Sequence, residues 1–142
     1  MINVALGVKE YHIQGVNGEY ILRINPTDDD FAEVLSNLVE SCDKVEETYG
    51  KMITEENDGV EIWKNSKARN KELRDLIDGV LGDKFCETVY GHISLHAGDG
   101  DGLPLWLSLI FSIFDEMSEE IDREKSAMKP RLEKYIGKYK RK

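Results

Sequence analysis

Four residues between positions 92 and 101 could hold a metal ion. His92 and His96 are four residues apart, and Asp99 and Asp101 follow them. Imidazole nitrogens and carboxylate oxygens are common ligands of transition metals, and two histidines at this spacing share one face when they lie on a helix. The glycines at positions 98, 100 and 102 favour a loop instead, because glycine destabilises a helix. We therefore predict loop histidines and no metal site.

The segment Asp99-Gly100-Asp101-Gly102 also resembles the start of a calcium-binding loop. An EF-hand loop needs further oxygen ligands at its positions 5 and 12. Counted from Asp99, these positions hold Leu103 and Ile110, whose side chains contain no oxygen. The segment therefore indicates a glycine-rich turn rather than a calcium site.

The chain shows none of the motifs that are typical of nucleophilic catalysis or phosphate binding. It lacks a Gly-x-Ser-x-Gly elbow, a P-loop and a Gly-x-Gly-x-x-Gly turn. Acidic runs such as Asp28-Asp29-Asp30 and Glu46-Glu47 are typical of solvated helix surface rather than of paired catalytic carboxylates. We predict no catalytic residues, no cofactor and no enzymatic activity.

Composition limits the class of protein and its partners. The 142 residues are 40% hydrophobic, enough for one core, and their formal net charge of −9 argues against a nucleic-acid partner. The longest apolar stretch, residues 103–114, is too short to span a bilayer, and the start lacks the basic region of a signal peptide. We expect a cytoplasmic protein without a membrane partner, in which Cys42 and Cys86 are buried, reduced thiols.

Hydrophobic periodicity predicts a single acidic α+β domain, mainly α, over residues 1–124. Alternating apolar residues around Asn17-Gly18 predict a hairpin of about residues 9–15 and 19–25. Val4, Leu6 and Val8 also alternate, but out of step with the hairpin. This change of phase indicates an extra strand, a bulge or a loose arm.

The rest of the domain is predicted to contain about four helices. Apolar residues recur at spacings of three and four from Phe31 to Met52, which predicts one long helix that ends before Asp58. A second apolar stripe covers residues 73–81, and a short third helix closes at Gly91. A fourth helix begins near Pro104, since proline suits the first turn.

The fourth helix is apolar nearly all round. A helix of this kind is either central to the core or meets a partner, such as another subunit or an amphipathic helix of a client protein. The core explains it most simply. The candidate protein-binding residues under the second interpretation are Trp106, Ile110, Phe111 and Phe114.

The last segment, residues 125–142, has eight basic side chains and one acidic side chain, a net charge of +7, so residues 1–124 carry −16. Pro130 and Gly137 interrupt the segment, which predicts a mobile basic tail. Such a tail could solubilise the chain, fold back onto the acidic body or bind an acidic partner.

Three stretches, taken in order, resemble the tail assembly chaperones of long-tailed bacteriophages of the siphophage type. The first is the hairpin at 10–25, which runs into an Asp-rich helix start and Phe31. The second is Leu-Arg-Asp-Leu-Ile-Asp-Gly-Val-Leu-Gly at 73–82, which is similar to the family's leucine/isoleucine-Asp-x-Val-x-Gly block. The third is Val89-Tyr90-Gly91, followed after a loop by the apolar helix.

The resemblance implies a non-catalytic role in virion tail assembly. Proteins of this family bind the tape measure protein in the host cytoplasm, help to recruit tail tube subunits, and are absent from the finished virion. A homo-oligomer is also compatible with the resemblance. The alternative is a small acidic interaction or regulatory module, of phage or bacterial origin, that binds a host protein.

Overall fold

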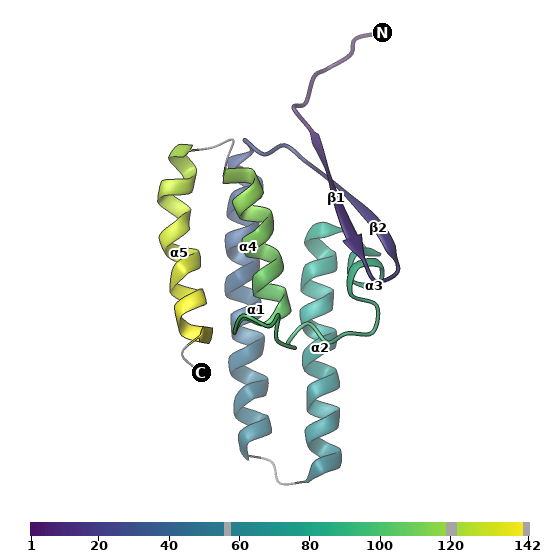
Figure 1. Cartoon of the computed structure of the whole chain (residues 1–142), viewed down its shortest axis with the longest axis vertical. Helices are drawn as coiled ribbons and strands as arrows, with labels where there is room; N and C mark the ends of the chain where they lie inside the picture. Colours follow the sequence, from purple (N-terminus) through teal and green to yellow (C-terminus); the bar gives the residue numbers. More distant parts are fainter. Residues whose placement is uncertain (56–57, 119–121, 141–142) are drawn as a thin grey trace.

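The computed structural model describes residues 1–55, 58–118 and 122–140, with side chains for 1–52, 58–118 and 130–140. An antiparallel hairpin is followed by helices (Figure 1), which confirms the predicted α+β, mainly α, fold class. No helix among these residues is both long and apolar enough to cross a membrane. The elements are β1 (Lys9–Gly15), β2 (Gly18–Ile24), α1 (Asp29–Glu55), α2 (Gly59–Leu81), α3 (Phe85–Tyr90), α4 (Leu105–Ser118) and α5 (Asp122–Lys140).

The long helices α1 and α2 pack side by side over much of their length (Figure 1). Each begins at an aspartate whose carboxylate accepts a backbone N–H of the first turn. Asp28 accepts from Asp30 at 3.0 Å, and Asp58 accepts from Val60 at 2.9 Å. These bonds satisfy N–H groups that have no partner within the helix, and the negative charge suits the helix N-terminus.

Helix α1 matches the predicted stripe, whereas α2 begins earlier than predicted. The second helix starts at Gly59 rather than near Leu73, so the polar stretch between them is helical. Only Leu73, Ile77 and Leu81 are buried on α2. Between Gly59 and Glu72 the helix has only exposed or half-buried residues, so this half lacks the buried apolar stripe that periodicity detects.

The hairpin is close to the predicted one, since its strands cover 9–15 and 18–24, and Val16 and Asn17 form the turn between the paired Gly15 and Gly18. Tyr11 lies opposite Leu22, and Ile13 lies opposite Tyr20. These four side chains belong to the face that packs on the core. The turn is hydrogen-bonded to α3, because the backbone N–H groups of Val16 and Asn17 donate to carbonyls of α3 at 3.0 and 2.9 Å.

Residues 1–8 form an arm that projects beyond the helices (Figure 1). The change of phase allowed an extra strand, a bulge or a loose arm, and the structure shows the loose arm. Gly7 has a φ of 67°, in the left-handed region that favours glycine. The Asn25 side-chain amide donates to the Leu6 carbonyl at 2.8 Å and so holds the base of the arm.

The prediction of a mobile basic tail at residues 125–142 is wrong for residues 125–140, which belong to helix α5, packed against α1 and α4. Pro130 and Gly137 both lie inside this helix. Leu132 and Tyr139 are buried, and the Tyr139 ring meets Trp106 edge to face at 5.6 Å. The tail therefore follows the alternative in which it folds back onto the acidic body; residues 141–142 lie outside the described residues.

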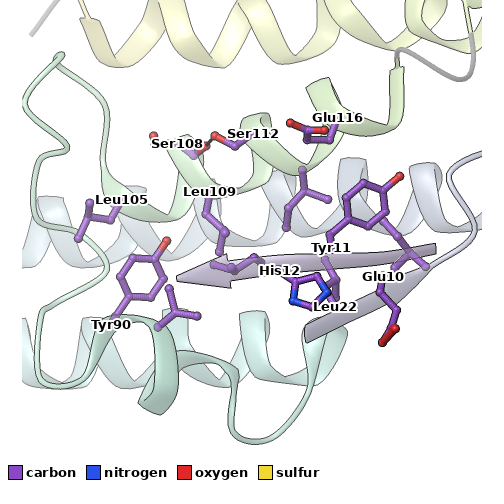
Figure 2. A pocket seen from close by; sticks show the side chains of 14 residues that line it. Glu10, Tyr11, His12, Leu22, Tyr90, Leu105, Ser108, Leu109, Ser112 and Glu116 are labelled. Carbon is purple, nitrogen blue, oxygen red and sulfur yellow. Dashed lines mark hydrogen bonds between the residues drawn. The ribbon is translucent and has the colours of Figure 1, made fainter. Parts of the chain in front are cut away.

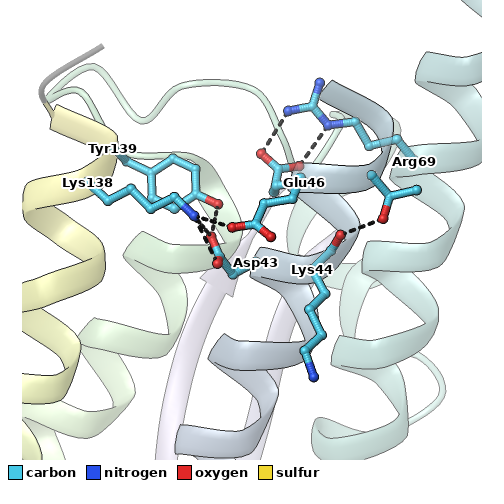
Figure 3. Close-up of polar contacts among 8 residues, drawn as sticks. Asp43, Lys44, Glu46, Arg69, Lys138 and Tyr139 are labelled. Carbon is cyan, nitrogen blue, oxygen red and sulfur yellow. Dashed lines mark hydrogen bonds and ion pairs between the residues drawn. The ribbon is translucent and has the colours of Figure 1, made fainter. Parts of the chain in front are cut away.

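A polar cluster joins α5 to α1 (Figure 3). Asp43 is only 8% exposed and accepts from the Tyr139 hydroxyl at 2.7 Å and from Lys138 Nζ at 3.0 Å. Lys138 also donates to Glu47 at 2.7 Å. Burial, and then the bond to Asp43, raise the pKa of Tyr139, so its hydroxyl stays a donor at neutral pH.

Gly15 should be intolerant of a side chain, whereas Gly79 should accept one. A Cβ at Gly15 would lie 2.5 Å from backbone atoms of both Thr88 and Val89, and no flexible side chain can give way there. We expect Gly15→Ala to lower the free energy of unfolding by about 1–3 kcal/mol. Gly79→Ala, on the open face of α2, should raise it by about 0.5–1 kcal/mol. Urea denaturation of both variants measures this, and equal effects would contradict the packing of β1 on α3.

The two acidic partners of Lys138 should differ in their contribution to stability. Asp43→Ala removes the buried acceptor that Lys138 and the Tyr139 hydroxyl share, so we expect a loss of about 1–3 kcal/mol. Glu47→Ala removes a carboxylate that is mostly exposed and should cost under about 1 kcal/mol. Thermal and urea unfolding compare the variants. A larger cost for Glu47→Ala would show that α5 does not depend on Asp43.

Candidate functional site

The candidate interface residues on α4 lie mainly in the core. Trp106 and Ile110 have no exposed surface, Phe114 is 6% exposed, and Phe111 is half-buried. Helix α4 packs against α1 on one side and α5 on another, so most of its circumference is covered. A partner could not reach the first three residues in the folded chain. The simpler prediction, that the apolar helix is core, agrees with this burial.

The candidate metal ligands do not converge. His92 is exposed, and the Asp99 carboxylate accepts the backbone N–H groups of Asp101 at 2.7 Å and Leu103 at 3.1 Å. These backbone bonds, that of Asp101 first, lower the pKa of Asp99. Asp99 therefore closes the glycine-rich turn that was predicted here. In the described residues, no group of three or more His, Cys, Asp or Glu side chains is placed to hold a metal ion.

The cysteines are free and buried, as predicted. Burial is the main reason that the pKa of Cys42 rises to about 12, with Glu46 and Asp43 adding to it. Burial also raises the pKa of Cys86. Thiols with such pKa values carry almost no thiolate at neutral pH and are poor nucleophiles.

An open groove of about 500 Å³ lies between the hairpin and α4 (Figure 2). The hairpin is held against α3, and α4 is held against α1 and α5, so the two elements face each other without packing closely. The walls and floor are mainly aliphatic and aromatic. They are formed by Tyr11, Ile13, Leu22, Ile24, Val89, Tyr90, Leu105, Leu109 and Ile113.

The rim of the groove is polar. Ser112 donates from its hydroxyl to the Ser108 carbonyl at 2.8 Å, so this hydroxyl is already satisfied by its own helix. Figure 2 shows Glu10 and Glu116 toward one end of the groove and Leu105 toward the other. An apolar floor with an acidic end suits an apolar segment that carries a basic residue at one side.

Strand β1 presents its open edge to this groove. In the described residues β1 pairs only with β2, and four consecutive residues of β1, positions 10–13, line the groove. Successive side chains of a strand point to opposite faces, so a surface that all four share must run along the strand edge. Such an edge can hydrogen-bond an added strand.

The sequence analysis missed the groove. Leu105 and Leu109 were assigned to the apolar side of α4. Their spacing does not show that a groove separates them from the hairpin. The available signal was the out-of-phase run Val4, Leu6 and Val8, which marks an apolar segment without a place in the hairpin.

Comparisons with known proteins found no match: no family model, no curated protein and no solved structure is similar to this chain.

His96 should make stability depend on pH. Its ring is half-buried, with Nε2 3.2 Å from the Ser66 hydroxyl and Nδ1 buried without a protein partner. Burial, and then Arg69, lower the pKa of His96 from 6.5, while Glu46 opposes them. The unfolded chain therefore binds this proton more readily than the folded chain, and the free energy of unfolding should fall as the pH drops below about 6.5.

Replacing His96 isolates this contribution. The expected result for His96→Gln is a flatter profile of unfolding free energy between about pH 7 and pH 5, because the group that protonates on unfolding is gone. Urea denaturation at several pH values measures both profiles. Parallel profiles for the variant and the wild-type chain would show that His96 has the same pKa in the folded and the unfolded chain.

Proposed function

We propose that this protein is a non-catalytic assembly chaperone that binds an apolar segment of a client protein in the groove between β1 and α4. The observation that supports this proposal is the groove itself, with its apolar floor, polar rim and open strand edge. Grooves of this kind receive either an added strand or an amphipathic helix.

The charge of the chain fits this role. The net charge of −9 gives a complex of this protein with an apolar client a large like charge, which opposes aggregation of such complexes. The basic residues Arg131, Lys134, Lys138 and Lys140 lie on α5, which packs against α4 and α1 and lines no part of the groove.

The sequence resemblance supplies the client. We propose that the protein acts as a tail assembly chaperone in an infected cell, where it binds the tape measure protein, helps to recruit tail tube subunits, and leaves before the virion is complete. The resemblance implies a long, aggregation-prone tape measure protein, and the groove offers an apolar surface for a segment of it. The binding surface differs from the one first considered, because Leu105, Leu109 and Ile113 line the groove, whereas Trp106 and Phe114 do not.

Filling the groove should prevent client binding. Ser112 is exposed on the rim, so Ser112→Trp places a large ring over the groove without changing the core. We expect at least a tenfold loss of affinity for the tape measure protein, about 1.4 kcal/mol, measured by co-purification and titration. Asn37→Trp, on an exposed position of α1 outside the groove, is the matched control and should bind like the wild type.

Two results would contradict the proposal. One is wild-type protein that captures no tape measure protein or that instead binds a bacterial host protein. The other is a folded Ser112→Trp variant with unchanged affinity, which would place the client on a different surface.

A further inference from the structure

The arm at residues 1–8 concentrates exposed apolar surface. Ile2 is 90% exposed, Val4 72% and Leu6 67%, and the whole segment contains no charged side chain. In an extended chain, alternate residues share one face, so these three side chains form a single apolar row. A row of this kind needs a cover, because exposed apolar strands otherwise aggregate.

The chain directs this row away from its own body. The bond from Asn25 to the Leu6 carbonyl and the left-handed conformation of Gly7 fix where the arm leaves the hairpin. A Cβ at position 7 would lie 2.7 Å from the Asn25 amide nitrogen, so the close approach also requires glycine. From this point the arm projects beyond the helices (Figure 1), and its apolar row faces solvent.

The groove matches the arm in length and spacing. Leu105, Leu109 and Ile113 follow one another at intervals of four residues, which on a helix places them roughly 6 Å apart. The same-face side chains of an extended strand are roughly 6.6 Å apart, so the row of three on the arm can meet the row of three on α4. The open edge of β1 lies along the same groove and can bond the arm's backbone.

We propose that the arm of a second copy of this chain lies in the groove as a strand added to β1, and that the exchange is reciprocal. The side chains of the arm and of the groove floor are uncharged, so this contact brings no like-charged side chains of the two acidic bodies together. Twofold symmetry buries two arms in two grooves at once, which moves the contact toward the area of roughly 1,200 Å² or more that a stable dimer needs.

This inference goes beyond the proposed function, because it concerns the chain in the absence of any client. The arm occupies the surface to which the client was assigned, so the dimer is a closed form that client binding must open. The exchanged arm thereby covers the groove and the apolar row until a client is present.

Mass measurements test the exchange on the full chain. We expect the wild-type protein to have twice the mass of one chain by light scattering, and a Val4→Asp/Leu6→Asp variant to dissociate at least tenfold more readily. The matched control is Val60→Asp/Trp63→Asp, which introduces the same two negative charges at two similarly exposed apolar residues of α2 and should remain dimeric. A monomeric wild type, or equal dissociation of the arm variant and the control, overturns the inference.

Cross-linking identifies the occupant. Protein with Val4→Cys is mixed with protein that carries Ser112→Cys and treated with diamide, which takes up the two thiol hydrogens as the S–S bond forms. We expect a mixed dimer between the two variants, and none when Asn37→Cys replaces Ser112→Cys. A double Val4→Cys/Ser112→Cys chain that closes its disulfide within one monomer would show that the arm fills its own groove, and overturns the exchange.

The client assay separates this inference from the proposed function. If the arm is exchanged, the Val4→Asp/Leu6→Asp variant should bind tape measure protein more tightly than the wild type, because its groove is vacant. A monomeric wild type that still captures the client overturns the exchange and leaves the chaperone proposal supported. A dimeric wild type that captures no client supports the exchange and overturns the chaperone proposal.

Discussion

The attachment of the hairpin to α3 is the constraint on which the candidate site depends. The Val16 and Asn17 N–H groups are bonded to α3, and the Tyr20 hydroxyl donates to the Leu81 carbonyl at 2.7 Å. The Tyr20 and Phe85 rings meet edge to face at 4.9 Å. These contacts lie on the side of α2 and α3. Leu22 and Ile24 of the hairpin still belong to the same apolar core as Leu109 and Ile113 of α4, so buried side chains of both elements line the groove.

The other wall of the groove is fixed by the C-terminal helix. Tyr139 of α5 packs on Trp106 of α4 and bonds to Asp43 of α1, so α5 holds α4 against the long helices. Glu46 of α1 accepts from Arg69 of α2 through both carboxylate oxygens at 2.7 Å, which ties the second long helix to the same frame. Both walls are thus set by contacts outside the groove, and a ligand would enter a surface that is already formed.

Local signals explain which parts of the fold were predictable. Asn17-Gly18 and the alternation around it predicted the hairpin, and the stripe from Phe31 to Met52 predicted α1, because each pattern is contained within the element that it specifies. The fate of the C-terminal segment depends instead on Asp43, 95 residues away from Lys138. Pro130 and Gly137 are helix breakers by intrinsic preference, and tertiary contacts outweighed that preference.

The candidate site was less predictable than the fold, for a related reason. Leu109 belongs to the apolar side of α4 whether or not a hairpin covers it, and Val4 alternates whether its row is buried or exposed. Periodicity reports the face of an element and says nothing of the distance to the next element. A groove is a space between two elements, so it becomes visible only once their separate attachments are known.

An apolar row and an open strand edge on the same small protein form a combination that natural proteins generally cover or blunt. The outer face of the hairpin is blunted here, since Glu10 pairs with Arg23 at 3.0 Å and His12 with Glu19 at 2.5 Å. The floor of the groove and the arm contain no charged side chain. Because charged pairs occupy the outer face of the hairpin while the arm and the groove floor stay apolar, those two apolar surfaces are the ones that we expect another polypeptide to cover.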